Sequence, residues 1–480
     1  MSPKTTLLGG VKRIHIIGIG GTLMGAFAAY LKRQGLFVTG SDQNVYPPMS
    51  DVLKEAGIEL FHGYAADNIL GQTTRPDLVV VGNVVQSTNQ EVRAAVDGGY
   101  GCCSLPEAME LFFLEDTHNI VVAGTHGKTT TSSMIAHVLT SFGKRPSYFI
   151  GGVSNDLPFG FNVSDNSHMG GYFVLEGDEY DTSFWDKGPK FNHYLPNDVL
   201  LTSVEFDHAD IFADLEAVKC AFRMLLTKIR GGRLVACHDY PAVRELVSGS
   251  TVDLITYGTE ESSSARFKIA NLRTENDKSV FDVIDSGKKV EQIKLCIAGR
   301  HNAANALASW IECTELGLDS ARVVSALGEF SGVKRRQEVK AVVKGITVID
   351  DFAHHPTAVR ETLAALRQRY ASARIIAVFE PRSATSRRKI FQQEYVKAFL
   401  SADAVFVSSP YDQSKIPDAE RFSSRQLVEN LVARGKQAAS FQQVNDGVRE
   451  VSNLARSGDV IVVLSNGGFG GFIEKIISKF

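Results

Sequence analysis

The strongest constraint on the fold is a pattern that occurs three times: a short apolar run rich in β-branched residues, a turn rich in glycine or aspartate, and a helical stretch. The three occurrences open at residues 13–17, 119–123 and 346–349. Each run is almost continuously apolar, as a strand needs when both faces of its parallel sheet are covered. The pattern therefore predicts an α/β protein made of parallel β-α units.

The length of 480 residues exceeds what one hydrophobic core supports, so several domains are expected. Boundaries near residues 116 and 333 would give three domains, 1–115, 116–332 and 333–480. We expect the first and third to be Rossmann-like and the second to resemble a P-loop ATPase. The alternating, polar pattern between about 260 and 298 predicts an antiparallel excursion in the middle domain.

Composition narrows the class of protein. The 51 Lys and Arg nearly balance the 54 Asp and Glu, so neither nucleic acid nor an anionic membrane surface is an expected partner. The six cysteines are scattered without a CxxC pair, which favours reduced thiols and a cytoplasmic location over disulfides or a zinc site. A run of about 18 apolar residues is lacking, and residues 1–10 lack the apolar core of a signal peptide, so no membrane segment is expected.

A candidate phosphate loop follows the strand 120–123 and precedes a helical stretch. Its residues are Gly124, Thr125, His126, Gly127, Lys128, Thr129 and Thr130. Glycines let backbone N–H groups face a phosphate, Lys128 is placed to reach the β- and γ-phosphates, and the Thr129 hydroxyl can bind Mg²⁺. The first glycine comes two residues closer to the Gly-Lys pair than in the common P-loop, so an ordinary β-α turn is the alternative.

Two further strand ends carry acidic residues. Strand 172–175 ends in Glu176, at the start of a run with four acids in six residues, and strand 199–203 leads to Asp207 and His208. A charge run alone is typical of a solvated turn. Beyond buried strands of the sheet that carries the phosphate loop, hard oxygen ligands favour Mg²⁺, with Thr129, Glu176 and His208 as metal-site residues.

The first strand leads into a glycine turn that resembles a dinucleotide fingerprint. The candidate residues are Gly18, Gly20, Gly21, Thr22 and Gly25, with Ser41 and Asp42 at the end of the second strand. Leu23 occupies the place of the third fingerprint glycine. We therefore interpret the turn as a diphosphate site that does not serve NAD; the alternative is a turn that binds nothing.

In the last third of the chain, polar residues follow three strands. Asp351 and His354 come after strand 346–349, and a segment with Arg382, Ser383 and two further arginines follows strand 375–379. The arginines suit a substrate carboxylate, with a basic surface loop as the alternative. Four glycines within residues 467–471 indicate a backbone close to a ligand, or a tight turn.

Together these motifs resemble the Mur ligases of peptidoglycan assembly over essentially the whole chain. The segments that carry the resemblance are 124–130, the Glu176 segment, Asp207-His208, His301-Asn302-Ala303-Ala304-Asn305 and Asp351 with His354-His355-Pro356. The resemblance implies an ATP- and Mg²⁺-dependent ligase whose donor is UDP-N-acetylmuramate, which would bind at the N-terminal glycine turn. Segments 41–50, 206–212, 380–383 and 465–471 are most similar to members that add L-alanyl-γ-D-glutamyl-meso-diaminopimelate, the murein tripeptide, in murein recycling.

The resemblance also implies residue roles. Catalytic roles fall to Lys128, Glu176, His208, Asp351 and His354. Adenine contacts fall to His301, Asn302 and Asn305, ATP phosphate or ribose contacts to Arg336 and Asp351, and peptide contacts to Arg382, Ser383 and His354. Three alternatives stay open: L-alanine as the acceptor, a non-catalytic nucleotide-binding regulator, and a dehydrogenase. The sequence leaves the oligomeric state undetermined.

Overall fold

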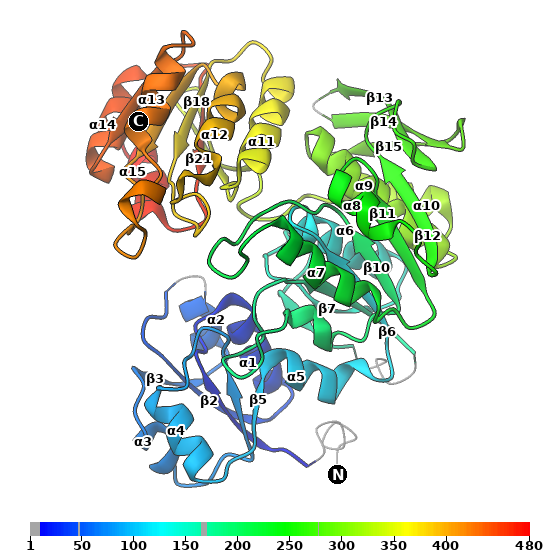
Figure 1. Cartoon of the computed structure of the whole chain (residues 1–480), viewed down its shortest axis with the longest axis vertical. Helices are drawn as coiled ribbons and strands as arrows, with labels where there is room; N and C mark the ends of the chain where they lie inside the picture. The colour runs from blue at the N-terminus through cyan, green and yellow to red at the C-terminus, as the bar shows by residue number, and fades with distance from the viewer. Residues whose placement is uncertain (1–9, 47–48, 165–169, 277) are drawn as a thin grey trace. The chain divides into compact units, whose positions relative to one another are not determined.

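The computed structural model describes residues 10–46, 49–164, 170–276 and 278–480 (Figure 1). Pro47 and Pro48 of the segment 41–50 therefore lie outside the described residues. The chain divides into two compact units. The first comprises residues 1–204, 218–257 and 308–326, and the second comprises 205–217, 258–307 and 327–480. Among the helices of the described residues, none is long and apolar enough to cross a lipid bilayer.

The N-terminal sheet is entirely parallel, with strand order β3-β2-β1-β4-β5. The apolar residues Ile14, Ile16 and Ile17 of β1 are buried, which explains the continuous apolar run in the sequence. Its elements are β1 (Arg13–Ile17), α1 (Thr22–Arg33), β2 (Phe37–Asp42), α2 (Met49–Glu55), β3 (Glu59–His62), α3 (Asp67–Leu70), β4 (Leu78–Val81), α4 (Gln90–Asp97), β5 (Cys102–Ser104), α5 (Leu105–Met109) and the π-helix η2 (Glu110–Leu114).

The middle part of the first unit has the strand order β12-β11-β10-β6-β9-β7-β8, with β8 antiparallel to β7. Because β6 lies between β9 and β10, the ends of these two strands flank the turn that follows β6, which is where open parallel sheets bind ligands. Its elements are β6 (His118–Ala123), α6 (Lys128–Ser141), β7 (Ser147–Phe149), β8 (Phe161–Asn162), β9 (Tyr172–Gly177), the 3₁₀-helix η4 (Lys190–His193), β10 (Asp198–Leu201), β11 (Arg233–Cys237), α8 (Pro241–Val247) and β12 (Asp253–Gly258).

The second unit contains the expected antiparallel excursion, in which β13 (Phe267–Glu275), β14 (Lys278–Asp285) and β15 (Lys288–Leu295) pair in sequence order. A separate sheet has the order β16-β17-β21-β18-β19-β20. Its elements are β16 (Glu338–Val343), β17 (Ile346–Asp351), α11 (Pro356–Arg369), β18 (Ile375–Phe379), α12 (Gln392–Ala398), β19 (Ala404–Ser408), α13 (Ser424–Val432), β20 (Gln437–Phe441), α14 (Val444–Leu454), β21 (Val460–Leu464) and α15 (Phe472–Ile477). The remaining α-helices are α7 (Leu215–Leu226), α9 (Arg300–Glu315) and α10 (Ser320–Glu329).

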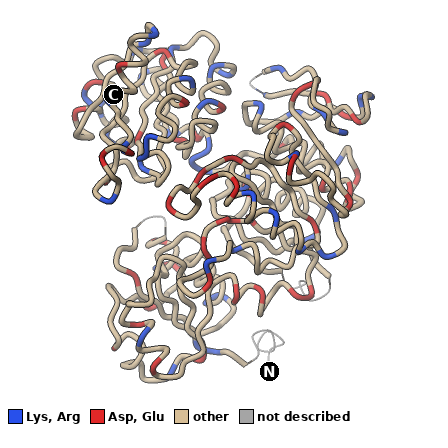
Figure 2. Tube along the Cα trace, viewed as in Figure 1, with Lys and Arg blue, Asp and Glu red and all other residues tan. Residues whose placement is uncertain are grey.

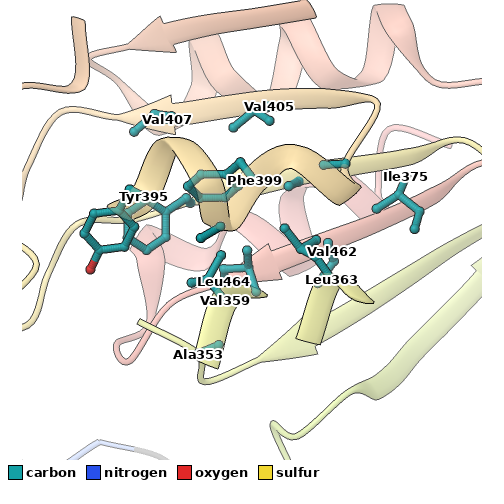
Figure 3. Packing of buried hydrophobic residues seen from close by; sticks show 14 of the residues in the cluster. Ala353, Val359, Leu363, Ile375, Tyr395, Phe399, Val405, Val407, Val462 and Leu464 are labelled. Carbon is teal, nitrogen blue, oxygen red and sulfur yellow. The ribbon is translucent and has the colours of Figure 1, made fainter. Parts of the chain in front are cut away.

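Strands β18, β19 and β21 of the C-terminal sheet are covered on both faces, so they are apolar at successive positions. Ile375 and Phe379 of β18 pack on one face with Val359 and Leu363 of α11 and with α12 (Figure 3). The intervening Ile376 belongs to a second core on the opposite face, together with residues of α14 and α15. Figure 2 shows basic and acidic residues interspersed along the chain.

Candidate active site

The phosphate loop is packed closely against the end of β10. Gly124 has φ +133°, and a Cβ atom there would lie 2.4 Å from the Thr202 hydroxyl oxygen, so a larger residue does not fit. The loop amides of Thr125 and His126 donate to the backbone oxygen and hydroxyl of Ser203, at 3.0 and 2.8 Å. This close approach requires the glycine that opens the shortened motif. The sequence did not single out Thr202 and Ser203, the residues that support the loop.

Helix α6 begins at Lys128, directly after Gly127, whose φ of 84° is left-handed. Gly127 carries no side chain that could accept from the first-turn amides, so these N–H groups suit an anion. The Lys128 ammonium donates to the Gly124 carbonyl at 2.6 Å and to both carboxylate oxygens of Glu179, at 3.1 and 2.9 Å. Burial by itself would lower the pKa of Lys128, but Glu179 raises it above its usual value, which keeps the charge.

The predicted magnesium ligands Thr129 and Glu176 lie together. The Thr129 hydroxyl donates to the Glu176 Oε1 atom at 2.8 Å, and the Gly151 amide donates to Oε2 at 2.7 Å. Burial raises the pKa of Glu176 despite these bonds and the nearby Lys128. A partly buried carboxylate and a hydroxyl are hard oxygen donors, and a cation beside them would favour the charged carboxylate, so this pair fits Mg²⁺.

The acidic run after β9 is not a solvated turn. In addition to the Lys128–Glu179 pair, Asp178 accepts from the Lys190 ammonium at 2.6 Å, and Asp181 pairs with Lys187 at 3.0 Å. Although burial would raise it, Lys190 and Lys128 hold the pKa of Asp178 at about 2. Glu179 and Lys190 are therefore site residues that the sequence did not single out. The only sequence signal for Glu179 was that the acidic run follows a strand expected in the same sheet as the phosphate loop.

The N-terminal glycine turn is shaped by contacts within its own domain. The amides of Gly18 and Ile19 donate to the Ser41 carbonyl, and the Gly20 amide donates to the Asp42 carboxylate at 2.8 Å. The Ser41 hydroxyl is fully buried and donates to Glu91. This hydroxyl therefore has its partner inside the domain, as a buried polar group needs, while the Ser41 carbonyl holds the glycine turn; the assignment of Ser41 to the sugar-nucleotide site stays a prediction.

Packing explains the glycine at position 25, because a Cβ atom there would lie 2.7 Å from the sulfur of Met49. Next to the turn, a cavity of about 290 Å³ lies within the first unit. Thr22 of the glycine turn and Gly151, which donates to Glu176, both line it. Other residues of its wall are Gly21, Asn83, Asp178, Lys190 and Tyr194.

The second unit places Asp207, His354 and Thr385 together. The Asp207 Oδ1 atom accepts from the Thr385 hydroxyl at 2.6 Å, and Oδ2 lies 3.8 Å from His354 Nε2. Burial would raise the pKa of Asp207, but His208, His354 and His355 together lower it; burial lowers the pKa of His354. His208 has φ +55°, a left-handed backbone conformation that is uncommon for a residue with a side chain.

The predicted ATP residues of the second unit meet around Gln337. Its side chain lies 3.3 Å from His301, and its backbone N–H donates to the Asp351 carboxylate at 2.8 Å. Asp351 also accepts from the Ala353 amide at 2.8 Å, so each of its two carboxylate oxygens accepts a hydrogen bond from a backbone N–H. The Arg336 guanidinium lies 5.0 Å from the ring centre of Phe352. Gln337 is a member of this group that the sequence did not reveal.

Asn302 and Asn305 are both buried on the first turns of α9. The Asn302 side chain donates to the Ala298 carbonyl at 2.7 Å, and the two asparagine side chains lie 3.5 Å apart. Together with His301 they form a polar cluster at the start of the helix. The structure thus brings together the three residues expected to contact adenine.

Arg382 lies against the glycine-rich turn after β21. A Cβ atom on Gly467 would be 2.2 Å from the Arg382 Nε atom, so the glycine makes room for the guanidinium, which also lies over the ring of Tyr411 at 4.0 Å. The Ser383 hydroxyl donates to Ser386 at 2.9 Å. Of the other two arginines, one donates to backbone carbonyls and one pairs with an acid: Arg387 contacts Ser383 and Asp412, and Arg388 contacts Glu420.

Taken together, the first unit holds Lys128, Thr129 and Glu176 in one constellation beside a cavity. His208, the third predicted metal ligand, belongs to the second unit. Each unit thus presents part of the predicted set: a cation and hard oxygen donors in the first, and a polar cluster with His354 in the second. The first constellation is suited to a nucleotide triphosphate and a divalent cation.

Models of the Mur ligase family match three consecutive parts of the chain. The family's catalytic domain matches residues 13–115, its middle domain residues 122–312, and its glutamate ligase domain residues 335–467. The chain belongs to the Mur ligase family. Members are ATP-dependent ligases with three α/β domains, so the enzyme class and the architecture expected from the sequence are confirmed.

Individual relatives span the whole chain. The UDP-N-acetylmuramate–L-alanyl-γ-D-glutamyl-meso-2,6-diaminoheptandioate ligase of Escherichia coli strain K12 is 38% identical and covers 97% of each chain. The UDP-N-acetylmuramate–L-alanine ligase of Agathobacter rectalis is 31% identical and covers 97% of this chain and 98% of its own. The crystal structure of a murein peptide ligase from Psychrobacter arcticus matches with a TM-score of 0.70 at 31% identity and covers 98% of both chains.

Proposed function

We propose that this enzyme joins L-alanyl-γ-D-glutamyl-meso-diaminopimelate to the lactyl carboxylate of UDP-N-acetylmuramate, converting ATP to ADP and phosphate, in murein recycling. The observation that carries ATP chemistry is the Thr129–Glu176 contact of 2.8 Å beside Lys128 at the start of α6. The tripeptide acceptor is supported by the 38% identity to the E. coli ligase of that name, against 31% to the L-alanine ligase.

The chemical difficulty of the first step is electrostatic. A carboxylate must attack the γ-phosphorus of ATP although both groups are anionic; two unit charges at 4 Å cost about 4 kcal/mol at an effective dielectric of 20, roughly a thousandfold in rate. Lys128 supplies one compensating charge. Thr129, Glu176 and His208 are the proposed ligands of Mg²⁺, which when bound supplies a further positive charge beside the phosphates.

The second step is attack of the peptide amine on the acyl phosphate, with release of phosphate. An α-amine has a pKa of roughly 8, so mild base assistance suffices near neutral pH. We assign His354 to the acceptor side, because burial lowers its pKa and keeps a neutral imidazole that can accept a proton. Arg382 and Ser383 are proposed to contact the peptide, with Arg382 beside its carboxylates.

The remaining assignments belong to the same proposal. We assign adenine to His301, Asn302 and Asn305, ATP phosphate or ribose to Arg336 and Asp351, and the diphosphate of the sugar nucleotide to the turn 18–25. In addition, we propose domain boundaries near residues 116 and 333. A cytoplasmic location is supported by six cysteines that are all free thiols.

The deciding experiment compares acceptors. Purified enzyme with MgATP and UDP-N-acetylmuramate should release ADP much faster with the tripeptide than with L-alanine, and mass spectrometry should find the UDP-muramoyl tripeptide. Turnover with L-alanine alone would replace the proposal by the L-alanine ligase. A protein that binds ATP but releases no phosphate with either acceptor would instead be a nucleotide-binding regulator.

A further inference from the structure

Lys190 contributes a positively charged ammonium group to the wall of the cavity of the first unit. Its side chain is 14% exposed, and the ammonium donates to Asp178 at 2.6 Å. Among the described residues that line this cavity, Lys190 is the one lysine or arginine. A lysine is seldom buried without a partner, and an ammonium offers three N–H donors, of which Asp178 takes one.

The Lys190–Asp178 pair is not needed to close its own loop. The Lys190 amide donates to the Tyr180 carbonyl at 3.1 Å, and the Thr182 amide donates to the Gly188 carbonyl at 2.9 Å. These backbone bonds fix the base of the loop 178–190 independently of the lysine side chain. The ammonium therefore has a defined position and remaining donors that a ligand in the cavity can use.

A second buried polar group lies in the same wall. Tyr194 is fully buried, and its hydroxyl has no hydrogen-bond partner among the described residues. Nearby Asp178 and Glu176, after burial itself, raise the pKa of this hydroxyl, so it stays protonated and can donate. Two residues of one cavity wall thus have N–H or O–H groups that can still donate, which favours an acceptor as the ligand, and an anion most strongly.

The donor has two anionic groups, a diphosphate and a lactyl carboxylate, and the position of Lys190 in the cavity wall indicates which of them it would contact. Gly21 and Thr22, which line the cavity, belong to the glycine turn proposed for the diphosphate. Lys190 is tied instead to Asp178, two residues beyond Glu176, which contacts Thr129 of the phosphate loop. The ammonium therefore belongs to the part of the wall next to the proposed γ-phosphate site.

We propose that Lys190 is a specificity residue that binds the lactyl carboxylate of the sugar-nucleotide donor and positions it for attack. This inference rests on the proposed function, because that function defines the donor. Asp178 holds the ammonium in place before the donor arrives, and the donor carboxylate then takes a second N–H of the same ammonium.

The test measures binding by calorimetry without ATP or peptide. Lys190→Met should weaken binding of UDP-N-acetylmuramate by about tenfold to a hundredfold, the loss of one charged hydrogen bond. Binding of UDP-N-acetylglucosamine, which has the same diphosphate but no lactyl group, should stay unchanged. Lys190→Arg should restore part of the affinity. The matched control is Lys187→Met, which removes an exposed lysine paired with Asp181 in the same loop and should bind both nucleotides as the wild type does.

Three results would overturn the inference. An equal loss for both nucleotides would assign Lys190 to the diphosphate, and unchanged binding of both would leave it a structural residue. A lower unfolding temperature with normal discrimination between the two nucleotides would have the same meaning. Failure of the wild type to bind UDP-N-acetylmuramate would instead contradict the proposed function, so the two failures are distinguishable.

Discussion

At the scale of single residues, the first turn of α6 contains three consecutive threonines, and the first and third have different surroundings. The Thr129 hydroxyl donates to Glu176, whereas the Thr131 hydroxyl is buried without a hydrogen-bond partner among the described residues. Both lie on the same helix, two positions apart. The contrast distinguishes Thr129, a candidate ligand of Mg²⁺, from Thr131, whose hydroxyl makes no hydrogen bond within the described part of the chain.

Thr129→Val should lower ATP-dependent phosphate release by at least about tenfold and raise the Mg²⁺ concentration needed for half-maximal rate, because it removes a hard oxygen donor while keeping the shape. The control Thr131→Val should behave like the wild type in the same titration, since the hydroxyl it removes has no partner. Equal Mg²⁺ curves for Thr129→Val and the wild type would refute the metal role of Thr129.

At the scale of elements, two short helices of the first unit are linked through one imidazole. His193, at the end of η4, lies 2.7 Å from Glu110 of η2 through Nδ1 and 2.8 Å from Asp186 through Nε2. Burial would lower the pKa of His193, but the two carboxylates raise it above 6.5. With a carboxylate at each ring nitrogen, the imidazolium thus connects η4 and the loop before it to η2.

His193→Gln should lower the unfolding temperature by a few degrees at pH 6 and by much less at pH 9. The folded-state pKa is raised, so the stabilisation is complete below the unfolded value of about 6.5 and is lost as pH rises through the folded value. Scanning calorimetry of both proteins across this range measures the difference. A difference that does not depend on pH would show that the imidazolium charge contributes nothing.

At the scale of the whole molecule, the turn after β10 forms part of the compact unit that contains the C-terminal sheet. Residues 205–217 fall in the second unit, where Asp207 accepts from Thr385 and from the amide of His208. Asp207 thus joins segments 178 residues apart. A buried carboxylate with such partners has a large effect on stability when its charge is removed.

Asp207→Asn should destabilise the second unit by about 2 kcal/mol at pH 7, the size of a hydrogen bond to a charged group, and should reduce turnover because His208 is next in the chain. The pKa of Asp207 is lowered, so this stabilisation is complete at pH 7 and fades only below the unfolded value of about 3.9. Thermal unfolding and phosphate release measure the two effects. Asp210→Asn, an exposed acid of the same turn, is the control; equal behaviour of both variants would contradict the prediction.

Much of the fold was predictable because strands buried on both faces leave continuous apolar runs. The predicted strands at residues 13–17 and 375–379 match β1 and β18. The candidate phosphate loop was also recognisable in the sequence, since its glycines are required by the local backbone conformation. Glu179 and Gln337 were not singled out, because their partners Lys128 and Asp351 are 51 and 14 residues away and sequence spacing does not encode such contacts.

By itself, the sequence determined the α/β class, the order of the modules and the positions of the glycine turns proposed to carry the chemistry, because burial patterns and glycine requirements are local. The tertiary structure decided which polar side chain meets which: Glu179 with Lys128, Lys190 with Asp178, and the Ser41 hydroxyl with Glu91. The physical reason is that a buried charge or hydroxyl needs a partner, and only the folded chain determines which partner is within reach.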